Sequence, residues 1–177
     1  GKTSSSVLRW CWPRDVNEIH RTVKIKIAWI GKTKEPAIQS LTDEYLKRIS
    51  QYAHVDGQAL RDEAALLLMF GRGSAGKANK TASSAKSALA LMDSHGKKFS
   101  SEEFARFLGQ YQDRNPLPLV FAVGPANGFT EAAHSVAQHT ISLSTMTLPH
   151  ELARVVLLEQ IYRAFTILKG HPYHSGH

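Results

Sequence analysis

Cysteine is almost absent from this sequence, since its 177 residues include a single one, Cys11. A lone thiol cannot form a disulfide within the chain or build a cysteine-based zinc site. The sequence is therefore not that of a small disulfide-stapled secreted domain, and it fits a reducing cytoplasm. With 42% hydrophobic and 21% charged residues, the composition is typical of one globular domain.

Long hydrophobic runs are also missing. The longest apolar stretch, Ala64–Phe70, is far shorter than the roughly 20 residues that a membrane-spanning helix needs. Residues 1–22 contain no hydrophobic signal core, and Asp15 and Glu18 interrupt any amphipathic transit peptide. We expect residues 1–22 to be a disordered leader or a non-native extension, and residues 23–177 to form a single domain. The alternative is a genuine N-terminal arm whose tryptophans pack on the body.

Acidic residues are fewer than basic ones, 15 against 22, so the net charge is +7. Residues 1–22 contribute +2 of this charge, which leaves +5 on the body. A mildly basic body suits an anionic partner such as nucleic acid. A net charge of this size is more often found on an ordinary soluble domain that happens to be basic. The identity of any partner therefore has to be argued from motifs.

Hydrophobic periodicity predicts strands and helices in alternation. Expected strands cover residues 23–31, 54–60, 88–93, 118–124 and 140–144. Expected helices begin at Pro36, near residue 61, after Ser100 or Ser101 as N-cap, near residue 129 and near Pro149. Glu103 is placed for a capping box at the third of these helices. Residues 71–87 are low in apolar side chains and predict a loop or a loose helix end. Residues 94–99 are expected to turn the chain. This order predicts an α/β domain with a mostly parallel sheet and helices on both faces.

Three strand ends stand out, because ligands of such sheets bind beyond the carboxyl ends of the strands. They read "LMDSHGK", "AVGPANG" and "SLSTMTLPH". Gly124 follows an apolar strand directly, so a backbone could approach a ligand there. An ordinary strand-to-helix turn is the more common explanation of such a glycine. The pattern is neither a dinucleotide-binding GxGxxG nor a P-loop.

The loop Leu143–Leu148 lacks the charges of an ordinary surface loop. Its backbone N–H and C=O groups could read the edge of a flat, neutral heterocycle such as adenine. The side chains of Leu143, Met146 and Leu148 would supply the apolar walls. The alternative is a helix cap, with Thr147 capping the last helix and His150 exposed.

The carboxyl-terminal segment carries the remaining candidates. Histidines at 171, 174 and 177 have a spacing that suggests a metal, but the run contains Pro172 and no nearby carboxylate, so we predict no metal site. Tyr173 and His174 could instead stack on a base or move a proton. Arg154 and Arg163 are expected to project from the last helix, either toward RNA or into surface ion pairs such as Glu159–Arg163.

Taken together, "LSTMTLPHELARVVLLEQIYRAFTILKGHPYH" closely resembles the end of the bacterial family of large-subunit rRNA pseudouridine N3-methyltransferases. These enzymes belong to the SPOUT class of trefoil-knotted methyltransferases. The segments "VKIKIAWIGK" and "LMDSHGKKFSSEEFA" also resemble the family, and the resemblance covers Val23 to the carboxyl end.

The resemblance implies an α/β fold with a carboxyl-terminal trefoil knot, a homodimer, and a cytoplasmic protein without membrane or metal. S-adenosylmethionine would bind in the knot. The substrate would be a pseudouridine in a stem-loop of 23S rRNA in the assembled ribosome. The resemblance assigns cofactor binding to Met92, Gly124, Leu143, Ser144, Thr145, Met146, Thr147 and Leu148, and it places Tyr173 and His174 near the target base. Our hypothesis is that Tyr173 and His174 are catalytic and that Arg154 and Arg163 bind RNA.

Two departures from the family pattern bear on function. Pro125 stands where the family usually has a second glycine, which removes a backbone N–H donor, and Ser175 stands where it usually has Arg or Lys. Pro125 keeps open the alternative of a catalytically silent RNA- or ribosome-binding protein of the same fold. A histidine-rich metal hydrolase is the third class, and it would need metal bound by the tail.

Overall fold

The computed structural model describes residues 23–70 and 87–175. The expected leader and all but the last residue of the expected loop 71–87 lie outside these ranges. The predicted alternation of strands and helices is confirmed. In chain order the elements are β1 (Lys24–Ile30), α1 (Pro36–Ile49), β2 (His54–Leu60), α2 (Glu63–Met69), β3 (Ala88–Lys98), α3 (Ser101–Arg114), β4 (Leu119–Val123), α4 (Glu131–Val136), β5 (His139–Ser142), α5 (His150–Leu168) and a 3-10 turn, Pro172–Ser175.

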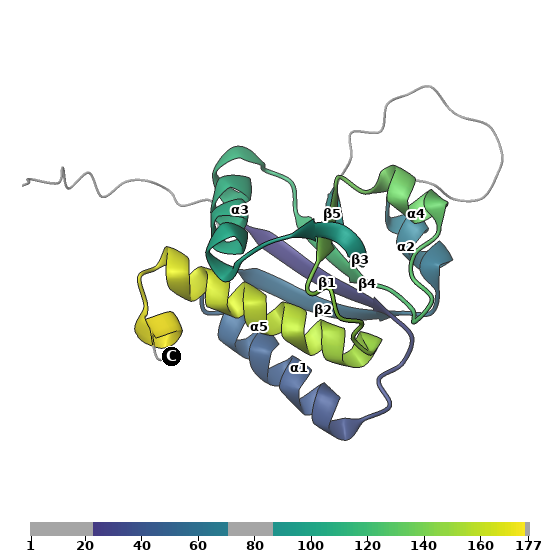
Figure 1. Ribbon diagram of the computed structural model, residues 1–177, viewed down its shortest axis with the longest axis horizontal. Coiled ribbons are helices and arrows are strands. Elements are labelled where there is room, and N and C mark those ends of the chain that lie inside the picture. Colours follow the sequence, from purple (N-terminus) through teal and green to yellow (C-terminus); the bar gives the residue numbers. More distant parts are fainter. Residues whose placement is uncertain (1–22, 71–86, 176–177) are drawn as a thin grey trace, which may run out of the picture.

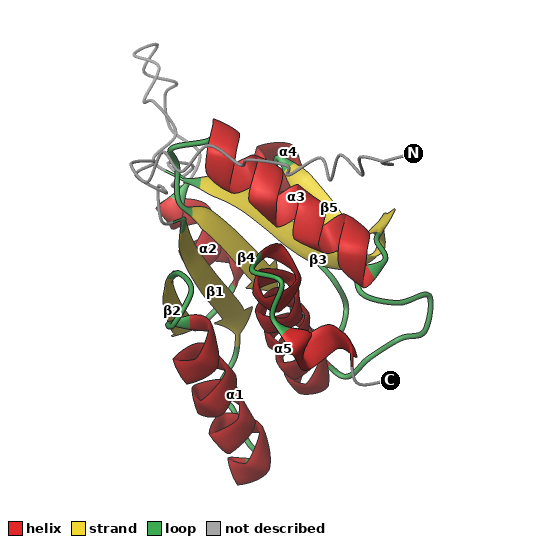
Figure 2. Ribbon diagram, turned by 90° about the vertical axis from the view of Figure 1, so that its left-hand side faces the viewer, coloured by secondary structure: helices red, strands yellow, loops and turns green. Residues whose placement is uncertain are grey.

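The five strands form one parallel sheet in the order β2-β1-β4-β3-β5. Helices α1, α3 and α5 cover one face, where Ile27 and Phe121 meet Leu157 in the larger core. Helices α2 and α4 cover the other face, where Leu66 and Ala133 pack on the sheet. Figures 1 and 2 show the sheet between these two layers, with α5 beside α1. The predicted mostly parallel sheet with helices on both faces is therefore confirmed.

Strand β3 runs further than its sequence suggests. The expected turn at residues 94–99 is wrong, because β3 continues to Lys98 and pairs with β5 after a shift in register between Met92 and Lys97. Gly96 makes this possible. A Cβ atom there would lie 2.6 Å from the backbone nitrogen of Ile141, so only glycine lets the two strands approach this closely.

The helix ends can be compared with the capping residues found in the sequence. The predicted capping box of α3 is confirmed: the Glu103 N–H donates to Ser100 Oγ at 3.1 Å, and the Ser100 N–H donates to Glu103 Oε2 at 2.7 Å. Helix α5 begins at His150, with Pro149 just before it and no side-chain cap, so Thr147 does not cap the helix. Gly170 follows its end with φ of 66°, a conformation that glycine adopts readily.

No helix within the described ranges is both long enough and apolar enough to span a bilayer.

Candidate functional site

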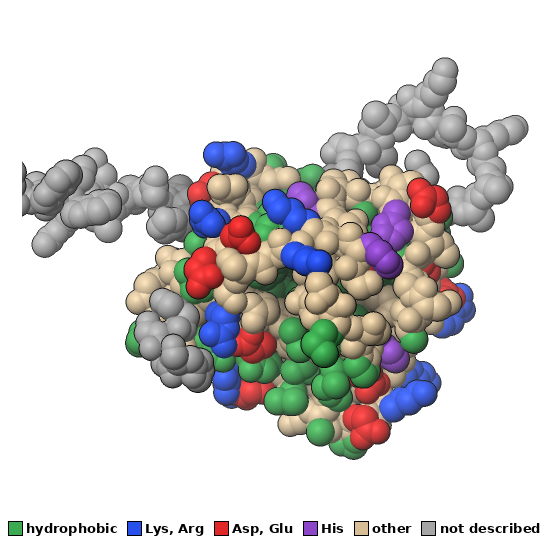
Figure 3. Space-filling model, in the orientation of Figure 1, with side chains coloured by type: hydrophobic (Ala, Val, Ile, Leu, Met, Phe, Trp, Pro, Cys, Tyr) green, Lys and Arg blue, Asp and Glu red, His purple; other side chains and the backbone are tan. Residues whose placement is uncertain are grey.

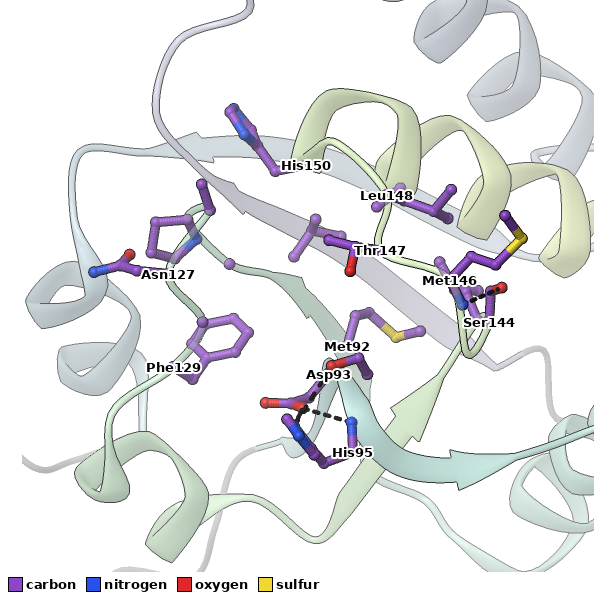
Figure 4. A pocket seen from close by; sticks show the side chains of 18 of the residues that line it. Met92, Asp93, His95, Asn127, Phe129, Ser144, Met146, Thr147, Leu148 and His150 are labelled. Atoms are coloured by element: carbon purple, nitrogen blue, oxygen red, sulfur yellow. Dashed lines mark hydrogen bonds and ion pairs between the residues drawn. The ribbon is translucent and has the colours of Figure 1, made fainter.

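A cavity of about 590 Å³ lies at the carboxyl ends of three adjacent strands. The ends of β3 and β4, the loop after β5 and the first turns of α5 all contribute to its wall. Figure 4 shows the loop that carries Asn127 and Phe129 on one side and the loop that carries Ser144 and Met146 on the other, with Met92 between them. The pocket therefore occupies the position at which parallel α/β sheets bind their ligands.

Most residues that the sequence assigns to the cofactor line this one pocket. They are Met92, Gly124, Leu143, Ser144, Met146, Thr147 and Leu148. Thr145 is not part of the wall. Residues that are more than 50 positions apart in the chain thus meet because β3, β4 and β5 end at the same edge of the sheet.

Hydroxyl groups shape the loop after β5. The Ser142 hydroxyl donates to the Ser144 carbonyl oxygen at 2.9 Å, and Ser144 Oγ accepts from the Met146 N–H at 2.9 Å. These short-range bonds satisfy the loop backbone without introducing charge. The hydroxylic, uncharged sequence of this loop is therefore explained in part by its own turn and in part by the neutral wall that it presents.

Gly124 approaches an aromatic ring that sequence reasoning missed. A Cβ atom at Gly124 would lie 2.8 Å from the Phe129 ring, and both residues line the pocket. The turn between them is closed by the Gly128 N–H, which donates to the Pro125 carbonyl oxygen at 2.9 Å, and Gly128 has φ of 79°. Phe129 is the one aromatic side chain in "GPANGF", a signal that could have identified it.

A carboxylate flanked by two histidines also borders the pocket and was not predicted. Asp93 Oδ1 accepts from the His95 N–H at 2.8 Å, and Asp93 Oδ2 lies 3.4 Å from His134 Nε2. The side chain of Asp93 is 14% exposed. The His95 backbone N–H is the main reason that the pKa of Asp93 lies below its usual value, against the opposing effect of burial. This carboxylate therefore stays ionised at neutral pH and gives one end of the pocket a polar character.

Arg154 and Arg163 are placed very differently by the structure. The expectation that Arg154 projects from its helix is wrong, because the residue is 1% exposed and its guanidinium carbon lies 4.2 Å from the centre of the Trp29 ring. Arg163 is also occupied, since its Nη2 donates to Glu159 Oε1 at 2.6 Å, the ion pair that was weighed as the alternative. Arg154 is thus buried and Arg163 is ion-paired, and the RNA-binding role predicted for them stays a prediction.

Tyr173 follows the carboxyl end of α5 and packs back against the middle of that helix. Its hydroxyl lies 3.4 Å from Glu159 Oε1, and Glu159 is about 14 Å along α5 from His150 at the pocket. The Tyr173 ring packs edge-on against Tyr162 at 4.8 Å, and the Arg163 guanidinium lies 5.2 Å from its centre. Burial, together with Tyr45 and Glu159 nearby, raises the pKa of Tyr173 to about 12. The side chain of His174 lies outside the described residues, so its predicted role stays a prediction.

The pocket suits a neutral heterocycle linked to a polar group. Its volume falls in the range of about 300–1,000 Å³ that is usual for sites of drug-sized ligands. Leu143, Leu148 and Met92 provide apolar surface, whereas Asp93 and His134 provide polar groups. S-adenosylmethionine combines an adenine ring with a charged methionine moiety, so these residues fit it. Among residues 23–70 and 87–175 no cluster of His, Cys, Asp and Glu side chains could hold a metal ion.

A family model described as "Predicted SPOUT methyltransferase" matches residues 23–174. The chain belongs to this family. It is 50% identical over 155 residues to the ribosomal RNA large subunit methyltransferase H of Koribacter versatilis, covering 88% of this chain and all of the relative. It is 40% identical over 152 residues to the protein of the same name from Geotalea daltonii, covering 86% and 99%. The resemblance noted in the sequence is thus confirmed.

Solved structures support the fold. A probable methylase family protein from Haemophilus influenzae superposes with a TM-score of 0.52 at 12% identity, over 85% of this chain and 70% of that one. At this identity the match concerns the fold alone.

Proposed function

We propose that this protein transfers a methyl group from S-adenosylmethionine to N3 of a pseudouridine in a stem-loop of 23S rRNA, within the assembled ribosome. The observation that carries the proposal is the pocket at the ends of β3, β4 and β5, whose wall contains the residues expected to hold the cofactor. Its relatives that are 50% and 40% identical carry the name of an rRNA large subunit methyltransferase. Residues 23–177 act as one catalytic domain.

The chain's own contribution to catalysis is alignment. When bound, S-adenosylmethionine supplies a methyl group already activated by its sulfonium, so no metal is required. The loop 143–148 holds the heterocycle between apolar side chains and backbone groups, while Gly124 and Phe129 form the facing wall. Fixing the donor and the acceptor base in one orientation can lower the barrier by several kcal/mol, about 7–11 in the best intramolecular cases.

Removal of the N3 proton is assigned to the carboxyl-terminal segment. Because the pKa of Tyr173 is raised to about 12, its phenol stays protonated at neutral pH and serves as a hydrogen-bond donor rather than as a base. His174 is then the candidate base. Arg163 is held by Glu159 beside the Tyr173 ring and orients it.

A homodimer completes the site in this proposal. Tyr173 contacts Glu159 and Tyr162, which lie about 14–18 Å along α5 from His150 at the pocket of its own chain. A second copy brings its segment to the first pocket. Exposed apolar side chains supply a surface for this association: Leu152 is 46% exposed on α5, Leu41 is 43% exposed on α1, and Met146 is 75% exposed. Figure 3 shows hydrophobic side chains gathered over the part of the surface formed by α5 and α1. The carboxyl-terminal trefoil knot and a cytoplasmic location beside the ribosomes belong to the same proposal.

Calorimetric titration with S-adenosylmethionine tests the first half of the proposal. We expect saturable binding of one cofactor per chain, abolished by Gly124→Trp and retained by Gln110→Trp on the exposed surface of α3. Incubation with ribosomes that lack the modification, followed by mass spectrometry of the rRNA, tests the second half. Cofactor binding without a methylated pseudouridine would refute the substrate. No binding with or without ribosomes would favour the silent RNA-binding alternative, in which Pro125 has impaired the pocket.

A further inference from the structure

Arg154 is a buried cation that donates a hydrogen bond to the loop between β1 and α1. Its Nη2 donates to Thr33 Oγ1 at 2.9 Å, and its guanidinium lies over Trp29 at the end of β1. Its Nε is buried without a hydrogen-bond partner, and no carboxylate in the described ranges forms an ion pair with it. Burying a guanidinium in this way is costly, so the contact with Thr33 has to matter for the position of the loop.

The loop that Arg154 holds is residues 31–35, between β1 and α1. It is anchored at two further points: the Gly31 N–H donates to the Leu60 carbonyl oxygen at 2.8 Å, and the Lys34 N–H donates to Glu151 Oε1 at 2.8 Å. Glu151 stands next to His150, which lines the pocket. The loop is therefore fixed at the start of α5, at the rim of the pocket.

Anchoring Thr33 inward leaves its two neighbours facing solvent. Lys32 and Lys34 are both exposed, and neither ammonium group forms an ion pair with any described residue. Lys26, by contrast, lies 3.9 Å from Asp56. The carboxylates of Glu35 in the loop and of Glu151, which accepts from the Lys34 N–H, lie in the same region, but neither is paired with the two ammonium groups. Two cations without an ion-pair partner on a fixed backbone are suited to phosphate oxygens, which position a nucleic acid without reading its sequence.

We propose that residues 31–35 form a phosphate-binding loop for the RNA substrate, in which Lys32 and Lys34 contact the backbone beside the target base and Arg154 positions the loop from inside. This inference rests on the proposed function. It replaces the direct phosphate contact expected of Arg154 by an indirect role, and it assigns the direct contacts to residues that the sequence did not single out.

The salt dependence of ribosome binding tests the two lysines. In the dimer of the full chain, Lys32→Gln with Lys34→Gln should weaken binding to unmodified ribosomes about tenfold at 0.1 M salt and lower the slope of log K against log salt by about 1.5. The matched control is Lys24→Gln with Lys47→Gln, which removes the same charge from exposed positions at the opposite ends of β1 and α1. Equal slopes for the lysine pair and the control would overturn the inference.

The role of Arg154 is tested by a double-mutant cycle with the lysine pair. If Arg154 acts through the loop, Arg154→Met weakens ribosome binding in the wild-type background but adds nothing when Lys32 and Lys34 are already Gln. Thr33→Val, which removes only the hydrogen bond, should reproduce part of the effect and guards against a folding defect of Arg154→Met. Additive losses would show a direct contact and refute the positioning role.

Cofactor calorimetry on the same variants separates this inference from the proposed function. The lysine-pair variant should bind S-adenosylmethionine like the wild type. If the wild-type protein binds and methylates ribosomes while the lysine-pair variant does so equally well, the loop assignment fails and the proposed function stands. If the wild type binds no ribosomes, both fail.

Discussion

The guanidinium of Arg154 lies 4.2 Å from the centre of the Trp29 ring, so α5 is joined to the end of β1 by a cation–π contact inside the protein. Burial lowers the pKa of Arg154, although Glu151 and Asp43 oppose this effect. Such a contact is directional, because a planar guanidinium can stack on an aromatic face while its nitrogens still donate. The contact connects α5, whose first turn lines the pocket, to strand β1.

Arg154→Lys should therefore destabilise the fold even though it keeps the charge. An ammonium loses the stacked geometry and the bond to Thr33, and we expect a loss of about 1–2 kcal/mol in the free energy of unfolding. Urea unfolding measures this loss. Arg106→Lys, on the exposed face of α3, is the control and should change stability by less than about 0.5 kcal/mol. Equal stability of the two variants would mean that the Trp29 contact contributes nothing.

Gly124→Ala should impair the cofactor pocket through Phe129. The new Cβ would lie 2.8 Å from the ring, so the ring has to move, and we expect the dissociation constant for S-adenosylmethionine to rise about tenfold, which corresponds to about 1.4 kcal/mol. Adding Phe129→Leu should restore part of the affinity. Gly109→Ala is the control, since its Cβ would meet only the end of the Leu168 side chain. Failure of Phe129→Leu to restore binding would exclude the ring as the cause.

Asp93 predicts an acid-sensitive contribution to stability. Its pKa in the folded protein lies below the unfolded value of about 3.9, so its stabilisation is fully present above about pH 5 and is lost as the pH falls through the unfolded and then the lower folded value. Asp93→Asn should lower the free energy of unfolding at pH 7 by about 1 kcal/mol. At acid pH, where Asp93 of the wild type becomes protonated, the free energies of unfolding of the variant and the wild type should be nearly equal.

Urea unfolding at pH 7 and at pH 3 checks this expectation. Asp113→Asn is the matched control, because Asp113 is exposed at the end of α3. A constant difference between Asp93→Asn and wild type at both pH values would show that the Asp93 charge is not what the fold uses.

Co-expression of two inactive variants tests whether the active site is shared between two chains. One chain carries Gly124→Trp and the other carries Tyr173→Ala with His174→Ala. In a homodimer with a composite site, half of the dimers formed at random are mixed and each mixed dimer has one complete site, so about a quarter of the wild-type methylation should return. A chain with all three changes, co-expressed with either variant, should restore nothing. No recovery from the first pair would place each active site within one chain.

The sequence by itself determined the features that depend on residues close to one another. The Ser100–Glu103 capping box spans a single turn, and the alternation of apolar segments reports burial one element at a time, so both were predictable. Gly124 and the loop 143–148 could be placed at the ligand-binding edge because the order of the elements predicts a parallel sheet, and the resemblance to the family assigned them to the cofactor.

Only the tertiary structure decided the rest. Whether Arg154 faces solvent or Trp29 depends on which helix face meets β1, and periodicity along α5 does not report this. The continuation of β3 to Lys98 depends on β5, which begins 41 residues further along the chain at His139, and on the room left by Gly96. The segment after α5 packs back on that helix, so Tyr173 contacts Tyr162 and Glu159 rather than the pocket, and the sequence pattern does not report this contact.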